Sequence, residues 1–282
     1  MSFHLKMNPN VSAEWLFENL DNPNLVILDA SPRENKSNLV PEYTNIQIKD
    51  ALKFDMEMVF LDKENPIPNM IPNERFFEDE CRKLGINNDS LIVVYDNLGV
   101  YTSPRVWWMF KAMGHHEIAV LDGGLSAWKK EQFPTEPTGN NKTVLGNLKA
   151  RYQSDLVINS TALLENIESK KMLVVDARSK ERFSGLIPEP RENMSGGHIP
   201  NSINLPFEKV LHRGKMKPKE ELKVIFKNLN IENQPLAFTC GSGITACIIL
   251  LASELISEKN KNILYDGSWS EWGQSGKFPV EK

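Results

Sequence analysis

The sequence repeats itself, and the repeat restricts the fold to two copies of one domain. Asp122-Gly-Gly-Leu-Ser-Ala-Trp128 recurs as Asp266-Gly-Ser-Trp-Ser-Glu-Trp272, an offset of 144 residues (266 − 122). Leu25-Val-Ile-Leu-Asp-Ala-Ser31 recurs as Met172-Leu-Val-Val-Asp-Ala-Arg178, with 147 residues between the two aspartates (176 − 29). Because both the order and the spacing of these segments are kept, we predict two similar domains of about 130 residues each.

A polar, proline-containing segment separates the two copies. Phe133–Lys142 contains two prolines and a glycine among polar residues, which is typical of a linker. We therefore predict a first domain over residues 1–134, a linker over residues 135–151 and a second domain over residues 152–282.

Short apolar runs alternate with helical patterns in each copy. Leu91–Tyr95 and Pro235–Thr239 are continuous apolar stretches of the kind that form buried parallel strands. Helical patterns follow them over residues 103–113 and 246–255. This alternation predicts an α/β fold in which each domain has a mainly parallel sheet flanked by helices. Ligands bind at the carboxyl ends of the strands in such sheets.

One cysteine lies at such a strand end. Cys240 follows the predicted strand, and a short loop with Gly241 and Gly243 leads into the predicted helix. This arrangement directs several backbone N–H groups and the positive end of a helix dipole toward the sulfur. A thiol in these surroundings ionises more readily than a free one and acts as a nucleophile. The alternative is a small buried cysteine without chemistry.

Composition narrows the classes of function. With 25% charged residues and a net charge of −4, the chain lacks the basic cluster typical of nucleic-acid binding. We see no membrane span and no secretory signal, so we expect a cytoplasmic protein without a membrane partner. Cys81, Cys240 and Cys247 form no Cys-x-x-Cys pair, so we expect neither a disulfide framework nor a metal site. We expect no cofactor.

The repeat also indicates which copy can hold the nucleophile. At an offset of 144, Tyr95–Val100 falls on Thr239–Ile244, so that Asp96 stands in the place of Cys240. A carboxylate cannot serve as a sulfur nucleophile. We therefore predict that the first domain is catalytically silent and that the second carries the chemistry.

Two further segments complete a set of motifs. Gly197-His-Ile-Pro-Asn-Ser-Ile-Asn-Leu-Pro-Phe207 resembles the Gly-His-Ile-Pro-Gly-Ala motif of the rhodanese superfamily, and Gly114–Gly124 with Trp128 resembles its closing Gly-Gly-Trp motif. Cys240-Gly-Ser-Gly-Ile-Thr245 resembles the loop of the 3-mercaptopyruvate sulfurtransferase branch, whereas the thiosulfate-using branch has basic residues after the cysteine. The chain thus resembles a tandem-domain sulfurtransferase over nearly its whole length.

The resemblance implies a substrate site and a mechanism. Two arginines with the spacing of Arg182 and Arg191 bind the carboxylate and carbonyl of 3-mercaptopyruvate in that branch, and arginine suits this role because it binds carboxylates bidentately. Cys240 would take the sulfur as a persulfide, release pyruvate and pass the sulfur to cyanide or to a thiol, for which thioredoxin is one candidate. The loop is expected to stabilise the persulfide anion through its backbone N–H groups. Its residues are Gly241, Ser242, Gly243, Ile244 and Thr245.

Three assignments stay open at the level of sequence. Ser242 either relays a proton or only caps the following helix. Gln47 stands where the family usually has a first-domain histidine that assists a serine, which puts that proton route in doubt. Cys247 is either a buried helix residue or a redox partner of Cys240.

Two other functions compete with this interpretation. The chain could be a thiosulfate:cyanide sulfurtransferase, or a non-catalytic persulfide carrier or sensor that docks on another protein. A phosphatase with a related cysteine loop would need an arginine six residues after the nucleophile, where this chain has Ala246.

Overall fold

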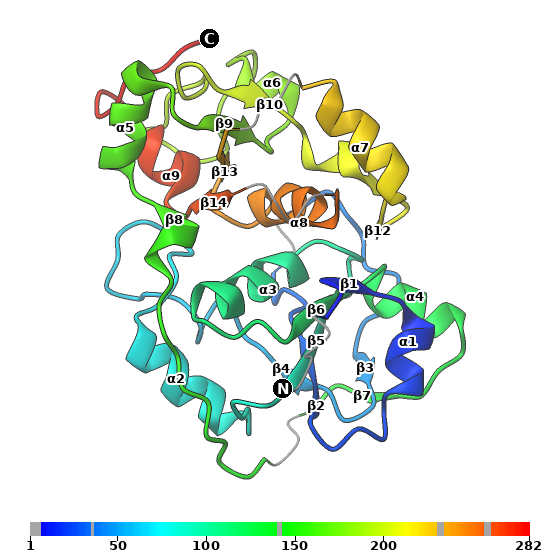
Figure 1. Ribbon diagram of the computed structural model, residues 1–282. Helices are drawn as coiled ribbons and strands as arrows, with labels where there is room; N and C mark the ends of the chain where they lie inside the picture. Colours follow the sequence, from blue (N-terminus) through cyan, green and yellow to red (C-terminus); the bar gives the residue numbers. More distant parts are fainter. Residues whose placement is uncertain (1–6, 35–36, 140–142, 230–233, 257–260) are drawn as a thin grey trace. The chain divides into compact units, whose positions relative to one another are not determined.

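The computed structural model divides into two compact units (Figure 1). Each half of the chain supplies most of one unit and a short segment of the other. The first unit takes its described residues from Met1–Leu61, Pro72–Gln153 and Arg213–Lys215, and the second takes them from Asp62–Ile71, Ser154–His212 and Met216–Lys282.

The structure describes residues 7–34, 37–139, 143–229, 234–256 and 261–282. Within these ranges, no helix is both long and apolar enough to cross a membrane. The domain boundaries set out above stay a prediction, and residues 140–142 of the predicted linker lie outside the described ranges.

Strands and helices alternate along both halves. The first half contains β1 (Asn10–Val11), α1 (Ala13–Glu18), β2 (Leu25–Asp29), β3 (Ile46–Ile48), β4 (Leu52–Lys53), α2 (Glu74–Lys83), β5 (Leu91–Tyr95), α3 (Ser103–Ala112), β6 (Ile118–Leu121), α4 (Gly124–Lys130) and β7 (Thr135–Pro137). The second half contains the 3-10 helix η1 (Ser154–Leu156), β8 (Val157–Ile158), α5 (Ser160–Ser169), β9 (Leu173–Asp176), α6 (Lys180–Phe183), β10 (Ile203–Asn204), η2 (Phe207–Val210), β11 (Leu211–His212), β12 (Lys215–Met216), α7 (Lys219–Lys227), β13 (Leu236–Thr239), α8 (Ala246–Ile256), β14 (Asn262–Tyr265) and α9 (Ser268–Trp272).

Each unit is built on a five-stranded sheet with the same topology. The strand order is β1-β6-β5-β2-β4 in the first unit and, written from the same end, β8-β14-β13-β9-β10 in the second. Neighbouring strands pair in parallel in both sheets. The predicted α/β fold, with two tandem domains and mainly parallel sheets, is confirmed. β5 and β13, the strands that precede Asp96 and Cys240, lie in the middle of their sheets.

Helices cover both faces of the first sheet (Figure 1). Trp128 of α4 and Leu16 of α1 pack with Val93 and other strand residues on one face. On the opposite face, Phe77 of α2 meets Phe110 of α3 edge to face, with 5.1 Å between the ring centroids. Because both faces are buried, the central strands β5 and β6 are apolar along their whole length, as expected for a covered parallel sheet.

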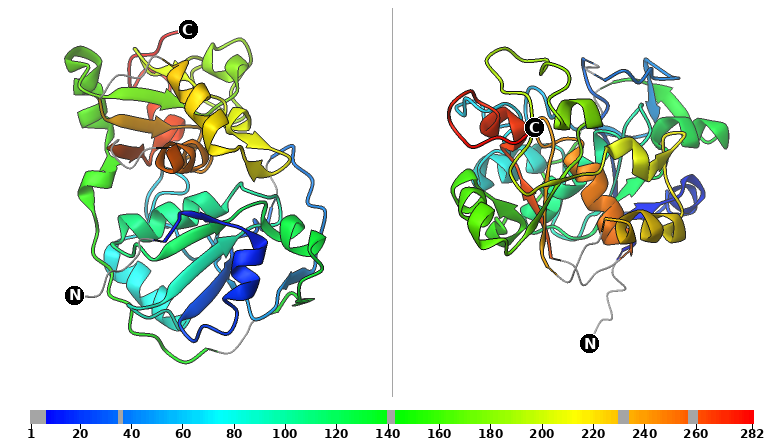
Figure 2. Two further views of the ribbon diagram at one scale, coloured as in Figure 1. Left: turned by 45° about the vertical axis from the view of Figure 1, so that its right-hand side comes forward. Right: turned by 90° about the horizontal axis from the view of Figure 1, so that it is seen from above.

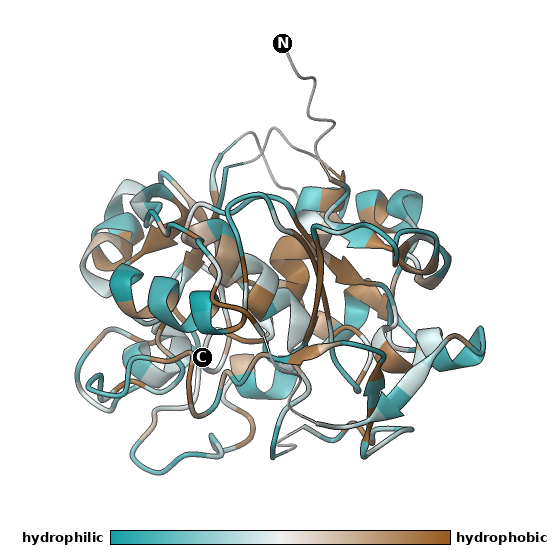
Figure 3. Cartoon of the chain, turned by 90° about the horizontal axis from the view of Figure 1, so that it is seen from below, coloured by the Kyte–Doolittle hydropathy of each residue, from teal (hydrophilic) through white to brown (hydrophobic). Residues whose placement is uncertain are grey.

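The second sheet is covered in the same way. Leu163 of α5 and Trp269 and Trp272 of α9 pack on one face, while α7 and α8 cover the other (Figures 1 and 2). Figure 3 shows the central strands mainly in the brown of apolar residues. Asn159 caps α5 by accepting a hydrogen bond from the Ala162 N–H, which fixes where this helix begins.

In the first unit, the loop between β5 and α3 begins at Asp96 and surrounds its side chain. Its side chain is fully buried. One carboxylate oxygen accepts the Leu98 N–H at 3.0 Å, and the other accepts the N–H groups of Tyr101, Thr102 and Ser103 at 3.0, 2.9 and 2.8 Å. The Ser103 hydroxyl donates a further bond at 2.7 Å. Burial raises the pKa of Asp96, and these hydrogen bonds oppose the rise. The loop is therefore an anion-binding nest that its own aspartate fills.

We predict that Asp96→Ala destabilises the chain strongly. The substitution removes the common acceptor of these N–H groups, and each buried donor without a partner costs about 1–3 kcal/mol, so the free energy of unfolding should fall by at least about 3 kcal/mol. Ser103→Ala is the matched control, because it removes one donor and should cost about 1 kcal/mol. Urea denaturation followed by circular dichroism measures both. Equal loss in the two variants would show that Asp96 does not hold the loop.

Candidate active site

Cys240 lies at the carboxyl end of β13, the middle strand of the second sheet. The residue is buried, with 2% of its surface exposed. Residues 240–245 form the loop that leads into α8. The thiol thus lies where the topology of a parallel α/β sheet places ligand sites.

The start of α9 fixes the backbone of this loop. The Ser268 hydroxyl accepts the Cys240 N–H at 3.2 Å, and the Trp269 N–H donates to the Cys240 carbonyl at 2.9 Å. The carbonyl of Gly241 accepts both the N–H and the hydroxyl of Ser270, at 2.9 and 2.6 Å. These bonds hold the main chain of Cys240 on both sides of its Cα atom.

The loop after Cys240 has N–H groups that bind none of the described residues. Within the part of the chain that the structure describes, the N–H groups of Gly241, Ser242, Ile244 and Thr245 donate no hydrogen bond. At the offset of 144, Ser242 and Thr245 match Leu98 and Tyr101, whose N–H groups bind the Asp96 carboxylate. The second unit therefore keeps the nest of the first but places a thiol where the carboxylate would be.

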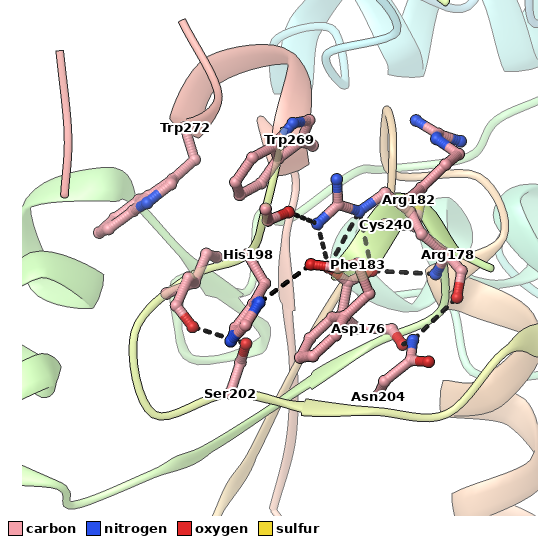
Figure 4. Close-up of polar contacts among 12 residues, drawn as sticks. Asp176, Arg178, Arg182, Phe183, His198, Ser202, Asn204, Cys240, Trp269 and Trp272 are labelled. Carbon is pink, nitrogen blue, oxygen red and sulfur yellow. Dashed lines mark hydrogen bonds and ion pairs between the residues drawn. The ribbon is translucent and has the colours of Figure 1, made fainter. Parts of the chain in front are cut away.

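A buried network of ion pairs lies beside the loop (Figure 4). Arg178, with a side chain that is 1% exposed, donates to both carboxylate oxygens of Asp176, the closer at 2.7 Å. It also binds Glu189 at 2.9 Å and the Gly197 carbonyl at 2.8 Å. Its guanidinium stacks 4.0 Å from the ring centre of Trp269. Arg178 thus ties β9 to the start of α9.

Arg182, on α6, reaches the loop from this network. Its Nη2 lies 2.5 Å from Glu189 Oε2 and its Nε lies 3.2 Å from Oε1. A Cβ atom added to Gly241 would lie 3.2 Å from Arg182 Nη2, so the guanidinium packs directly against the loop. Burial lowers the pKa of Arg182, but the hydrogen bonds and charge of Glu189 outweigh it and raise the pKa overall.

Arg191 reaches the same loop through a serine. Its Nη1 donates to the Ser270 hydroxyl, which in turn donates to the Gly241 carbonyl. Burial lowers the pKa of Arg191, as does the charge of Arg182, while Cys240 and Glu189 oppose the shift. No carboxylate of a described residue lies within ion-pair distance of Arg191. The structure thus brings both arginines singled out from the sequence to the loop of Cys240.

A residue from the first half of the chain, missed by the sequence reasoning, contacts this site. Asn69 belongs to the second unit, and its Nδ2 donates to the Ser242 hydroxyl at 3.0 Å. The segment that carries it is anchored by the Ile71 N–H, which donates to Asp266 Oδ2 at 2.8 Å. The hint that the sequence gives is that prolines 66 and 68 stiffen this segment.

Gln47, by contrast, has a structural role in the first unit. Its Nε2 donates to the Ala51 carbonyl at 3.0 Å and to Glu136 at 2.8 Å, and its Oε1 accepts the Gly139 N–H at 3.1 Å. The side-chain amide presented to Ser242 is therefore that of Asn69.

All three cysteines are free and buried. The Cys247 thiol, in the first turn of α8, donates to the Gly243 carbonyl at 3.3 Å and so helps to shape the loop. Burial raises the pKa of Cys81 well above its ordinary value, so that thiol stays protonated and unreactive.

Ser268 adopts a backbone conformation that is unusual for a residue with a side chain. Its φ is +48°, while the matching residue of the first unit is Gly124, with a φ of +54°. A left-handed non-glycine residue costs about 1–2 kcal/mol. Its hydroxyl, which accepts the Cys240 N–H and donates to the Tyr265 carbonyl at 2.9 Å, is the gain that offsets this strain.

Comparisons with known proteins agree with this geometry. A family model described as the rhodanese-like domain matches residues 12–131 and 159–275. The 3-mercaptopyruvate sulfurtransferase of Escherichia coli K12 is 35% identical over 275 residues, covering 96% of this chain and 97% of that protein. The thiosulfate sulfurtransferase of Cricetulus griseus is 40% identical over 276 residues, covering 93% and 91%. The crystal structure of SseA from Escherichia coli, described with the 3-mercaptopyruvate sulfotransferases, matches with a TM-score of 0.81 and 33% identity, covering 94% of this chain and 100% of that one.

We predict that Ser268→Gly separates reactivity from stability. Glycine adopts the same φ without strain but lacks the hydroxyl, so alkylation of Cys240 by iodoacetamide should slow about tenfold while the chain stays folded. Ser268→Ala lacks the hydroxyl and keeps the strain, so it should be less stable than the glycine variant by about 1 kcal/mol. Mass spectrometry of the alkylated peptide and thermal unfolding provide the two readouts. A glycine variant that reacts at the wild-type rate would exclude this role of the hydroxyl.

Proposed function

The chain belongs to the rhodanese family, and we propose that it acts as a 3-mercaptopyruvate sulfurtransferase. One observation carries the proposal: the buried thiol of Cys240 lies in a loop with open N–H groups, against which Arg182 packs and to which Ser270 links Arg191. A nucleophile, an anion nest and two guanidinium groups are the parts that sulfur transfer from an anionic donor needs.

In the first stage, the Cys240 thiolate attacks the sulfur of 3-mercaptopyruvate. A sulfur–sulfur bond forms, the carbon–sulfur bond breaks, and its electron pair stays on carbon as the pyruvate enolate. The proton of the donor's thiol balances the step by moving to that carbon, which leaves pyruvate and a Cys240 persulfide anion. Arg191 and Arg182 hold the carboxylate and the carbonyl of the donor, and they stabilise the charge that develops on the enolate oxygen.

The persulfide anion is stabilised by the open N–H groups of the loop. The first unit supports this role, because the same loop there binds the carboxylate of Asp96. Since a side-chain amide does not ionise near neutral pH, Asn69 orients the Ser242 hydroxyl rather than acting as an acid or base. The hydroxyl proton of Ser242 is thereby left to donate toward the donor or the persulfide.

In the second stage, a thiol or cyanide attacks the outer sulfur and releases the Cys240 thiolate. Thioredoxin is a suitable acceptor, because it presents a reactive thiol. We place the enzyme in the cytoplasm, where thiols stay reduced, in keeping with its three free cysteines.

The alternative donor, thiosulfate, is favoured by one comparison. The relative from Cricetulus griseus, 40% identical to this chain, is a thiosulfate sulfurtransferase. Against this, Gly241 and Ser242 bring no cation next to Cys240, and a dianion gains most from such cations. A persulfide carrier without turnover would take up one sulfur atom per molecule. It would then form no more than one equivalent of pyruvate.

We predict that steady-state kinetics with both donors distinguish these functions. The value of kcat/KM should be at least about a hundredfold higher for 3-mercaptopyruvate than for thiosulfate. Cys240→Ser should abolish transfer and keep the circular dichroism spectrum, and mass spectrometry should find one added sulfur atom on Cys240 in the wild type after donor treatment. A higher kcat/KM for thiosulfate would contradict the assignment, as would sulfur transfer by the serine variant.

We also predict that Arg191→Ala impairs the use of 3-mercaptopyruvate selectively. Losing a bidentate guanidinium–carboxylate contact should lower kcat/KM for that donor about a hundredfold. Arg191→Lys keeps the charge without the fork and should fall between the alanine variant and the wild type. Lys180→Ala, which removes an exposed cation on α6, is the control and should change neither donor. An equal loss with both donors in Arg191→Ala would mean that the arginine only supports the structure.

A further inference from the structure

The charges that surround the Cys240 loop nearly cancel one another. Asp176 and Glu189 supply two carboxylates to the connected network, and Arg178 and Arg182 supply two guanidinium groups. Arg191 adds a third guanidinium that has no carboxylate partner among the described residues. This network and Arg191 together therefore carry one positive charge in excess before Cys240 ionises.

Glu189 limits the net positive charge of this group of residues to one. Its side chain is 4% exposed, and its two oxygens bind Arg178 and Arg182 at once. Asp176 already binds Arg178 through three hydrogen bonds, at 2.7, 3.0 and 3.2 Å. Asp176 therefore already neutralises the charge of Arg178. The charge that Glu189 neutralises is that of Arg182.

A buried carboxylate beside the guanidinium groups of an anion site weakens the binding of every anion. The carboxylate weakens the binding of a dianion more than that of a monoanion, because it repels each charge of the ligand. In the interior, where screening by salt is weak, this difference is large enough to choose between ligands. A carboxylate at this position discriminates against the ligand with the higher charge.

We propose that Glu189 is a specificity-determining residue that selects a monoanionic α-keto acid donor over the dianion thiosulfate. It does so by cancelling the charge of Arg182 while leaving that guanidinium's remaining N–H groups available as donors. This inference rests on the proposed function and adds the physical basis of its donor selectivity. Figure 4 shows Arg182 beside Cys240, with Arg178 and Asp176 next to it.

Glu189 also holds Arg182 in place, and this second effect has a different signature. Displacement of Arg182 would impair both donors, because it changes the site's shape. Removal of the negative charge would change the ratio of the two kcat/KM values, because the donors differ by one charge. The ratio therefore reports the charge, whereas the absolute values also report the position of the guanidinium.

The test compares variants that differ in charge at nearly constant shape. In Glu189→Gln, the ratio of kcat/KM for thiosulfate to kcat/KM for 3-mercaptopyruvate should rise about tenfold. In Glu189→Asp, which keeps the charge and shortens the reach, rates should fall while the ratio stays at the wild-type value. Glu181→Gln is the matched control: it removes an exposed carboxylate on the same helix as Arg182, and it should leave the ratio unchanged.

A charge-restoring pair keeps the inference testable if Glu189→Gln does not fold. The double variant Glu189→Gln with Arg182→Gln removes both partners of the buried pair, which is better tolerated than removing one. It retains one excess positive charge, while Arg182→Gln alone has none. The thiosulfate-to-mercaptopyruvate ratio should therefore be about tenfold higher in the double variant than in Arg182→Gln.

The outcomes separate this inference from the proposed function. A wild-type chain that fails to use 3-mercaptopyruvate refutes the function. A wild type that uses it, together with an unchanged ratio in Glu189→Gln, refutes only the role of Glu189. An equal change of ratio in Glu189→Asp and Glu189→Gln would assign the effect to the position of Arg182 and overturn the charge argument.

Discussion

The N–H groups of the loop after the central strand require an anion, and the two halves of the chain meet this requirement differently. In the first unit, the carboxylate of Asp96 accepts four backbone N–H groups from within the loop. In the second, Cys240 stands in that place, and N–H groups of Gly241, Ser242, Ile244 and Thr245 bind none of the described residues. One fold thus gives a filled nest and an open one, and only the open nest can take a ligand.

An open nest must be held from outside, because no internal anion closes it. Hydroxyl and N–H groups at the start of α9 bind the backbone of Cys240 and Gly241. Ser268 has a strained backbone conformation that lets its hydroxyl bind the Cys240 N–H. The matching residue of the first unit is a glycine, which adopts this conformation without strain. Asn69, from a segment of the first half that belongs to the second unit, adds the bond to Ser242. The structural differences between the copies therefore concentrate where the chemistry does.

Local sequence was sufficient to predict the parts of the site that one strand, loop and helix determine. The α/β fold and the position of Asp96 in the loop of the first copy followed from apolar runs and from the repeat. Asn69 could not be found in this way, because 173 residues separate it from Ser242 and no periodicity links them. The left-handed φ of Ser268 depends on a contact with a neighbouring strand. The hydrogen bonds that Gln47 makes within the first unit join residues far apart in the sequence, which no local pattern indicates. The role of the Glu189 carboxylate could not be predicted from the sequence, because it depends on its contacts with Arg178 and Arg182.

The distribution of charge follows from the same requirement. A nest of N–H groups attracts any anion, so it offers no discrimination between a persulfide, an α-keto acid and a divalent oxyanion. Discrimination must come from full charges placed beside the nest, and these cost stability unless they are paired. The two arginines satisfy both conditions. Arg182 is paired with Glu189, whereas Arg191 donates to the Ser270 hydroxyl and its charge is not neutralised by a carboxylate of the described residues. The site can then hold an anion next to a thiolate without gathering enough positive charge to favour a dianion.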